Sequence, residues 1–235
     1  LENTYVDEGD AGSGQQAQAV LAASYNNLEV VSGGRITAQA QLDINSNSGG
    51  VVYIRAQSVN VKNGGKIDAD GLGFGPWGDY AQGNSECSNQ QAASVQSSNH
   101  ENNCSAGGTY RNWDVDCKGG GGGNKTAGEN QSGTYSCGNW GQGGVVKGDA
   151  AANILTLGGA GGGGTNYSTG VDGHGGGLVV IGAALLTVEP GGVISANGNN
   201  GDSWDHGGGA GGTVALFADL VENEGTIEAT GGSAS

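Results

Sequence analysis

One phrase of glycine pairs and alternating apolar residues recurs along the chain, and this repeat constrains the fold more than any other feature. Residues 49–71 hold two short alternating runs, and residues 176–198 repeat the same order at a constant offset of 127 without a gap. A third copy at 211–231 lacks about two residues in its middle, and half a copy at 28–38 precedes its equivalent by 31 residues. Self-similarity of this kind is typical of stacked repeat architectures.

Apolar residues alternate within each copy, as at Val52, Ile54 and Ala56, and this pattern predicts short, half-buried strands. A glycine interrupts nearly every window of ten residues, and each one would cost a helix about 1 kcal/mol. We expect an all-β fold, a Gly-rich β-solenoid (parallel β-helix) with a long disulfide-bearing loop insertion. Successive coils would bury aligned apolar residues, and glycine would form the corners. A β-sandwich or barrel is the alternative, because short strands with glycine turns build these as well.

The repeat also predicts which side chains face inward and which face outward. The expected inward positions are Ile67, Ile194, Ile227, Ala69, Ala196 and Ala229. The outward positions between them look like an ordinary solvated face: Thr37, Asp68, Ser195 and Glu228.

The chain divides into four ranges by these patterns. Residues 1–27 are polar and support no assignment, 28–71 and 176–235 carry the solenoid coils, and 72–175 form an insertion rich in Cys, Asn and Trp. The chain begins at Leu1 without Met and ends in a Gly/Ser/Ala run, so we expect a portion of a longer protein.

All four cysteines lie in the insertion, at Cys87, Cys104, Cys117 and Cys137. An even number in a loop-rich segment with little core favours two disulfides, because cross-links restrict the unfolded chain most effectively there. Three pairings are possible. Zinc is the alternative, but it usually requires closely spaced cysteine pairs, which this spacing does not provide.

Acceptor triplets for N-linked glycans also fall within 72–175, and none lies on a strand of the repeat. They are Asn103, Asn124, Asn130 and Asn166. Covalent N-glycans are expected on at least one of them if the chain is eukaryotic and secreted.

Charge restricts the partners. The 23 acidic and 8 basic residues give a formal net charge of -15, which opposes binding to nucleic acid and to anionic membranes. No apolar stretch has the length of a membrane-spanning helix, so no membrane insertion is expected.

Two acidic clusters are candidates for polysaccharide chemistry: Lys66 with Asp68 and Asp70, and Asp202 and Asp205 with His206. Neither has a pattern specific for catalysis, so no catalytic residue is assigned and an enzyme is not expected. No cofactor is expected either. Incidental Ca²⁺ is conceivable at acidic side chains, namely Asp70, Asp79, Asp202 and Asp205. Aromatic side chains either stack on sugars or pack under the cross-linked loop, namely Trp77, Trp113, Trp140 and Trp204.

The phrase of glycine pairs, alternating apolar runs and long glycine runs, as at 207–216, resembles the glycine-rich repeat regions of large eukaryotic cell-surface proteins. Among these are the mastigoneme proteins that form hairs on algal flagella. The resemblance covers 28–71 and 175–232 and implies an extracellular, glycosylated, filament-forming role at the cell surface. We therefore expect a self-assembling structural protein. A carbohydrate-active or carbohydrate-binding β-helix, or an adhesin passenger domain, is the alternative.

Overall fold

The computed structural model describes residues 23–38, 50–73, 121–129, 143, 146, 155–159, 173–201 and 207–233. In these residues every regular element is a β-strand and none is a helix. The all-β class expected from the alternating pattern is therefore confirmed for the described part of the chain.

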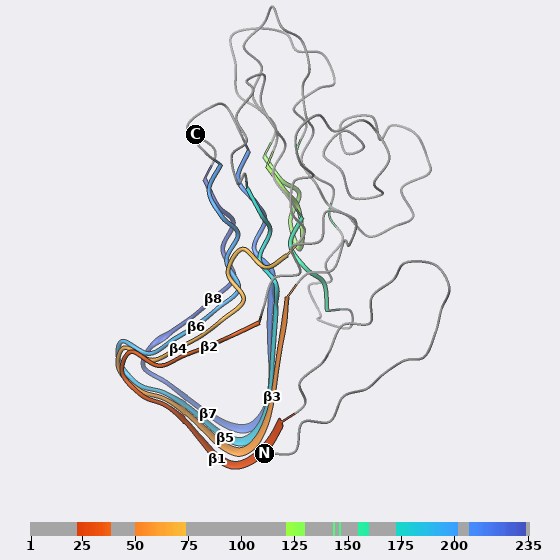
Figure 1. Cartoon of the computed structure of the whole chain (residues 1–235). Helices are drawn as coiled ribbons and strands as arrows, with labels where there is room; N and C mark the ends of the chain where they lie inside the picture. The colour runs from red at the N-terminus through yellow and green to blue at the C-terminus, as the bar shows by residue number, and fades with distance from the viewer. Residues whose placement is uncertain are drawn as a thin grey trace, which may run out of the picture.

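Eight strands form two four-stranded parallel sheets, ordered β1-β3-β5-β7 and β2-β4-β6-β8. The chain passes from one sheet to the other with each successive strand. Each strand therefore pairs with the strand that lies two elements later in the sequence (Figure 1). The strands are β1 (Ala23–Val30), β2 (Arg35–Thr37), β3 (Val51–Val61), β4 (Lys66–Asp68), β5 (Leu178–Val188), β6 (Val193–Ser195), β7 (Thr213–Asn223) and β8 (Thr226–Glu228).

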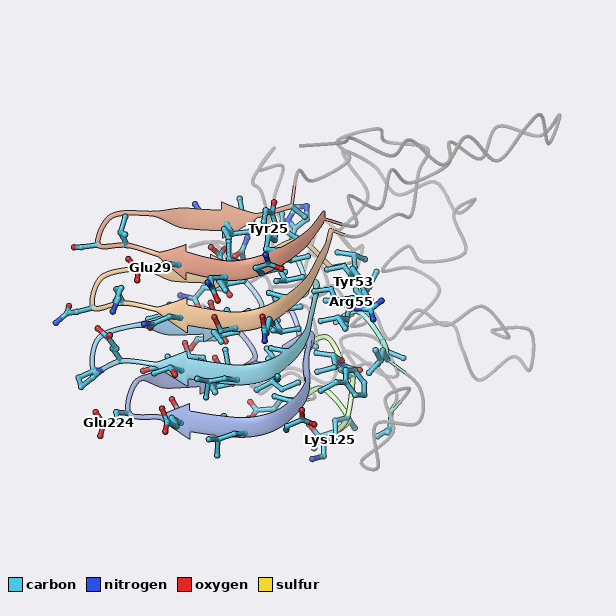
Figure 2. The ribbon with its side chains drawn as sticks, turned by 90° about the horizontal axis from the view of Figure 1, so that it is seen from below. Tyr25, Glu29, Tyr53, Arg55, Lys125 and Glu224 are labelled. Atoms are coloured by element: carbon cyan, nitrogen blue, oxygen red, sulfur yellow. The ribbon has the colours of Figure 1, made fainter. Side chains whose placement is uncertain are left out.

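Each long strand and the short strand after it belong to one repeat unit. Unit 1 comprises residues 23–38, unit 2 residues 50–73, unit 3 residues 173–201 and unit 4 residues 207–233. Figure 2 shows the four units stacked one above another, with Glu29 of unit 1 towards one end and Glu224 of unit 4 at the other.

The pairing register follows the sequence repeat. Val59 lies opposite Leu28, 31 residues earlier, and Leu186 lies opposite Val59, 127 residues later. Unit 4 pairs at an offset of 35 in β7 but 33 in β8, so its two missing residues fall in the turn between these strands. The offsets expected from the sequence are thus confirmed.

The core lies between the two sheets and consists of rows, meaning residues at the same position in successive units. One row runs through Ile36, Ile67, Ile194 and Ile227, of which the two central members are fully buried. Ala69 and Ala196 are fully buried as expected. Ala229, also expected in the core, is exposed. It lies in the last unit, and no further described unit covers it.

The long strands change their alternation in the middle. In β3 the buried residues are Val52, Ile54 and Ala56, and then Val59 and Val61, while positions 57 and 58 both avoid the core. A strand with two successive residues outside the core must turn there, and Figure 1 shows the bend in the long strands. A single strand therefore lines two sides of the core.

The turns between long and short strands depend on glycine. Gly33, Gly64 and Gly191 occupy one row with φ of 74°, 73° and 82°, a region that side chains disfavour. The N–H of Gly33 donates to the carbonyl of Gly64 at 2.9 Å, and that of Gly64 donates to Gly191 at 3.0 Å. The shorter turn of unit 4 does not continue this row.

Glycine-rich segments close the space beyond the two sheets and run side by side (Figure 1). They hydrogen-bond through their backbones, as Gly177 N–H does to Ala69 O and Gly212 N–H to Ala196 O, both at 2.7 Å. A Cβ at Gly176 would overlap the carbonyl oxygen of Ala196. The segments thus approach so closely that their contact positions exclude side chains.

Part of the range 72–175 belongs to this glycine-rich layer. Gly122 N–H donates to Gly208 O at 2.9 Å, Gly159 N–H donates to Gly123 O at 3.1 Å, and Ala210 N–H donates to Gly159 O at 2.8 Å. Residues 121–129 and 155–159, which fall within the range 72–175, are therefore hydrogen-bonded to unit 4.

The close approach predicts opposite effects for two glycines. Gly176→Ala should destabilise the fold by about 1–3 kcal/mol, because the added methyl meets backbone atoms that cannot move aside. Gly182→Ala is the matched control, since its nearest atom, Ile54 O, would be 3.9 Å away; it should be neutral or slightly stabilising. Chemical denaturation measures both, and equal stability of the two variants would contradict the packing.

Candidate functional site

A polar network of charged and amide side chains lies along the sheet β2-β4-β6-β8. Its centre is Asp68 on β4, which is 0% exposed. Arg35 on β2 donates to both carboxylate oxygens, from Nε at 2.6 Å and from Nη2 at 2.7 Å. The bidentate pair joins unit 1 to unit 2 and keeps the buried charge compensated.

Asp70 joins unit 2 to unit 3. It forms an ion pair with Lys66 at 2.6 Å and accepts hydrogen bonds from Ser195 Oγ at 2.9 Å and from the Asn197 N–H at 2.7 Å. Its own N–H donates weakly to Asp68 at 3.4 Å. The contacts with Lys66 and Asp68 thus hold Asp70 within unit 2, and those with Ser195 and Asn197 connect it to unit 3.

Asn197 repeats this arrangement one unit further on. Its Oδ1 accepts from the N–H and the hydroxyl of Thr230, at 2.8 and 3.0 Å, and its Nδ2 donates to Glu228 at 2.7 Å. Asp70, Asn197 and Thr230 occupy one row, because they are separated by the offsets of the neighbouring strands. A side-chain oxygen of one unit therefore caps the backbone N–H of the next unit.

The network corrects one expectation from the sequence. Asp68 and Ser195 were expected on an ordinary solvated face, but both are 0% exposed. They do alternate with the buried isoleucines, as expected. The pattern could not reveal that Arg35, from the preceding unit, would pair with Asp68.

The surroundings of Asp70 set the direction of its pKa. Partial burial alone would raise this pKa, but the hydrogen bonds from Lys66, from the Asn197 backbone and from Ser195 together hold it below the ordinary value of 3.8. Lys66, Asp68 and Asp70, the first candidate cluster for polysaccharide chemistry, are thus brought together, but Lys66 is paired with Asp70 and Asp68 is paired with Arg35. The arrangement is suited to joining units, and Asp68 is closed to a substrate.

Charged pairs also follow the turn beside Gly64. Lys62 lies 2.8 Å from Glu189 of unit 3 and 3.7 Å from Glu29 of unit 1. The hydrogen bond between Lys62 and Glu189 raises the pKa of the lysine and lowers that of the glutamate. Because Glu29 is exposed and Lys62 and Glu189 are only partly buried, solvent screens both pairs and they contribute little to stability. They show that side chains of opposite charge from neighbouring units meet at this edge.

Asn124 is a predicted glycan acceptor that the structure places in a buried contact, at 7% exposure. Its Nδ2 donates to the carbonyls of Gly211 at 2.9 Å and Gly212 at 3.0 Å, and its Oδ1 accepts from Thr156 at 2.6 Å. Thr213 in turn donates to the Thr156 carbonyl at 2.7 Å. A glycan would replace one N–H of this amide, so the folded geometry favours a structural role for Asn124. No signal in the sequence separates this role from that of an acceptor.

The other predicted site residues lie outside the described residues. These are Cys87, Cys104, Cys117, Cys137, Asn103, Asn130, Asn166, Asp79, Asp202, Asp205, His206, Trp77, Trp113, Trp140 and Trp204. Within the described ranges there is no group of three or more His, Cys, Asp or Glu side chains suited to a metal ion. Nor do those ranges contain a helix long and apolar enough to cross a membrane.

The lowered pKa of Asp70 predicts how stability depends on pH. A carboxylate with a depressed folded pKa stabilises the fold above its unfolded value of 3.8, and this stabilisation is lost as the pH falls through the folded pKa. Asp70→Asn should therefore unfold more easily at pH 7 and lose less stability between pH 5 and about pH 2 than the parent does. Thermal unfolding across this range is the measurement. The exposed Asp219→Asn is the control, and parallel curves for Asp70→Asn and the parent would contradict the role of the charge.

Asn124 offers a test in which the acceptor motif and the amide contact can be separated. Asn124→Ala should destabilise the fold by about 1–3 kcal/mol, because buried carbonyls and Thr156 lose their partner. Thr126→Ala destroys the glycan acceptor motif and leaves the amide intact, so it should change stability little. Denaturation and intact mass after expression in a glycosylating host measure both variants. A glycan mass lost in Thr126→Ala would show that Asn124 is modified instead.

Comparison with known proteins gives no match to a family model and no significant match among curated proteins or solved structures. The resemblance to glycine-rich surface-protein repeats thus stays a prediction from the residue pattern.

Proposed function

We propose that the four repeat units are consecutive coils of a β-solenoid. The parallel order of both sheets supports this fold, as does the alternation of the chain between them. Equal residues stack in all four units, as in the isoleucine row from Ile36 to Ile227. A sandwich does not require the same residues to lie in register from strand to strand.

We propose further that the protein is structural, an extracellular segment of a glycosylated surface filament or coat that self-assembles. The observation that carries the proposal is that, among the described strands, the first and last strand of each sheet are paired on one side only. In the described residues, β1 and β2 pair only with unit 2, and β7 and β8 pair only with unit 3. Their outer edges therefore offer backbone donors and acceptors to another strand.

The apolar rows reach the open end at unit 4. Val221 continues the row of the fully buried Val59 and Leu186, yet it is 42% exposed. This row is buried inside the stack and exposed to solvent at its end, so the Val221 side chain would bury more apolar surface if a further strand covered it. This favours association over an isolated stack.

A carbohydrate-active β-helix is the alternative, and the geometry of the network disfavours it at the predicted cluster. Asp68 is buried and bound by Arg35, and Asp70 is bound by Lys66. Catalysis by such groups requires a carboxylate within reach of the substrate. In the fold these two carboxylates join neighbouring units, Asp68 through Arg35 and Asp70 through Asn197, and this role agrees with a structural protein.

Assembly of the purified chain tests the proposal. We expect concentration-dependent, elongated oligomers in sedimentation velocity and filaments or sheets in negative-stain electron microscopy. A monodisperse monomer at high concentration would contradict self-assembly. Cleavage of acidic or neutral polysaccharides would support the alternative.

Two valine variants show whether the open edge takes part. Val221→Lys should weaken assembly, because it places a charge at the end of an apolar row. Val146→Lys is the control, since Val146 is similarly exposed, at 51%, but lies outside the four units. An equal effect of both variants would argue against assembly through the edge of β7.

A further inference from the structure

Charge is distributed unevenly along the stack of units. Units 1 and 2 carry four basic side chains against three acidic ones. Units 3 and 4 carry five acidic side chains and no Lys or Arg in their described residues. Four of these five lie in unit 4: Asp219, Glu222, Glu224 and Glu228.

From this asymmetry we propose that unit 4 binds unit 1 of a second copy of the chain, head to tail, and that Glu228 pairs with Arg35 of the second copy. The inference rests on the self-assembly proposed above and specifies its contact. Head-to-head contact would bring two acidic ends together, whereas head-to-tail contact joins an acidic end to the end that carries Arg35. A heterologous contact of this kind generates an open filament when each added copy continues the stack along the same axis.

Continuing the register by one unit identifies the contacts. The row Leu28, Val59, Leu186, Val221 would continue with Leu28 of the second copy. The isoleucine row would continue from Ile227 to Ile36. In the backbone, Lys62 N–H donates to Val30 O at 2.9 Å, and Glu224 N–H donates to Val188 O at 2.8 Å. By the same pattern Val31 N–H of the second copy reaches the carbonyl of Asn223.

Arg35 is placed to act on both sides of such a junction. It lies two residues before Thr37 and reaches diagonally to Asp68, which is the partner of Thr37 in the next unit. Glu228 is the last residue of the row that contains Thr37 and Asp68. In the head-to-tail contact it would lie diagonally opposite Arg35 of the second copy, on the side away from Asp68. The Arg35 side chain is 56% exposed and a guanidinium has five N–H donors, so it can bind a second carboxylate.

One row opposes the junction. Glu222 would face Glu29 of the second copy, and like charges directly opposite one another are destabilising. Lys62 lies 3.7 Å from Glu29 and reduces this repulsion. Glu222 is therefore expected to weaken the junction, and Glu228 to strengthen it.

The net charge makes the test sharp. At a formal charge of -15, copies repel one another, so any substitution that removes a negative charge should favour assembly in general. The proposed junction predicts the opposite for one position. Glu228→Gln keeps an acceptor for Asn197 but loses the charge, and it should weaken association on the order of tenfold. Glu129→Gln, an exposed change of equal charge outside the units, should leave association equal or stronger.

Glu222→Gln completes the set and should strengthen association. Sedimentation velocity over a concentration series measures the association constant of each variant, and thermal unfolding verifies that each one folds. If the parent assembles and Glu228→Gln assembles equally well or better, the junction is wrong while self-assembly stands. If the parent does not assemble, both proposals fail. A weaker association of Glu228→Gln alone, with Glu129→Gln unchanged, supports the junction.

Discussion

Backbone hydrogen bonds between neighbouring repeat units are the interaction on which the rest of this structure depends. They connect the units in both sheets, through the turns at Gly33, Gly64 and Gly191, and across the glycine-rich layer. Because equivalent backbone positions of neighbouring units pair, the side chains at equivalent positions must stack on one another. Apolar rows then form the core, and polar rows form the network that holds Asp68 and Asp70.

Glycine makes this pairing possible on the side that has no strands. Gly176 and Gly212 lie where a Cβ would overlap a backbone carbonyl, so the segments there approach without side chains. The 52 glycines of the chain thus reflect a packing requirement in part. Such a layer buries few apolar atoms, and the apolar core is confined to the space between the sheets. Polar contacts such as the Asn124 amide then hold the layer to unit 4.

The sequence predicted the strands and their register well, because both follow from local periodicity and from a constant offset. It predicted side-chain surroundings less well. The burial of Asp68 depends on Arg35, which lies 33 residues earlier, and alternation carries no information about such a partner. Asn124 shows the same limit, because an acceptor triplet looks the same whether its amide faces water or the Gly211 and Gly212 carbonyls. Ala229 was misjudged because a repeat pattern does not reveal where a stack ends.

The long separation between units 2 and 3 has a consequence for how the chain folds. Units 1 and 2 pair across 31 residues, but units 2 and 3 pair across 127. Loop-closure entropy grows only with the logarithm of length, so two doublings of a flexible loop add about 1.2 kcal/mol. The equilibrium therefore tolerates the excursion, whereas the rate of pairing falls as contacts become less local. Two locally paired halves would form first, and their docking through β3 and β5 would be the slow step.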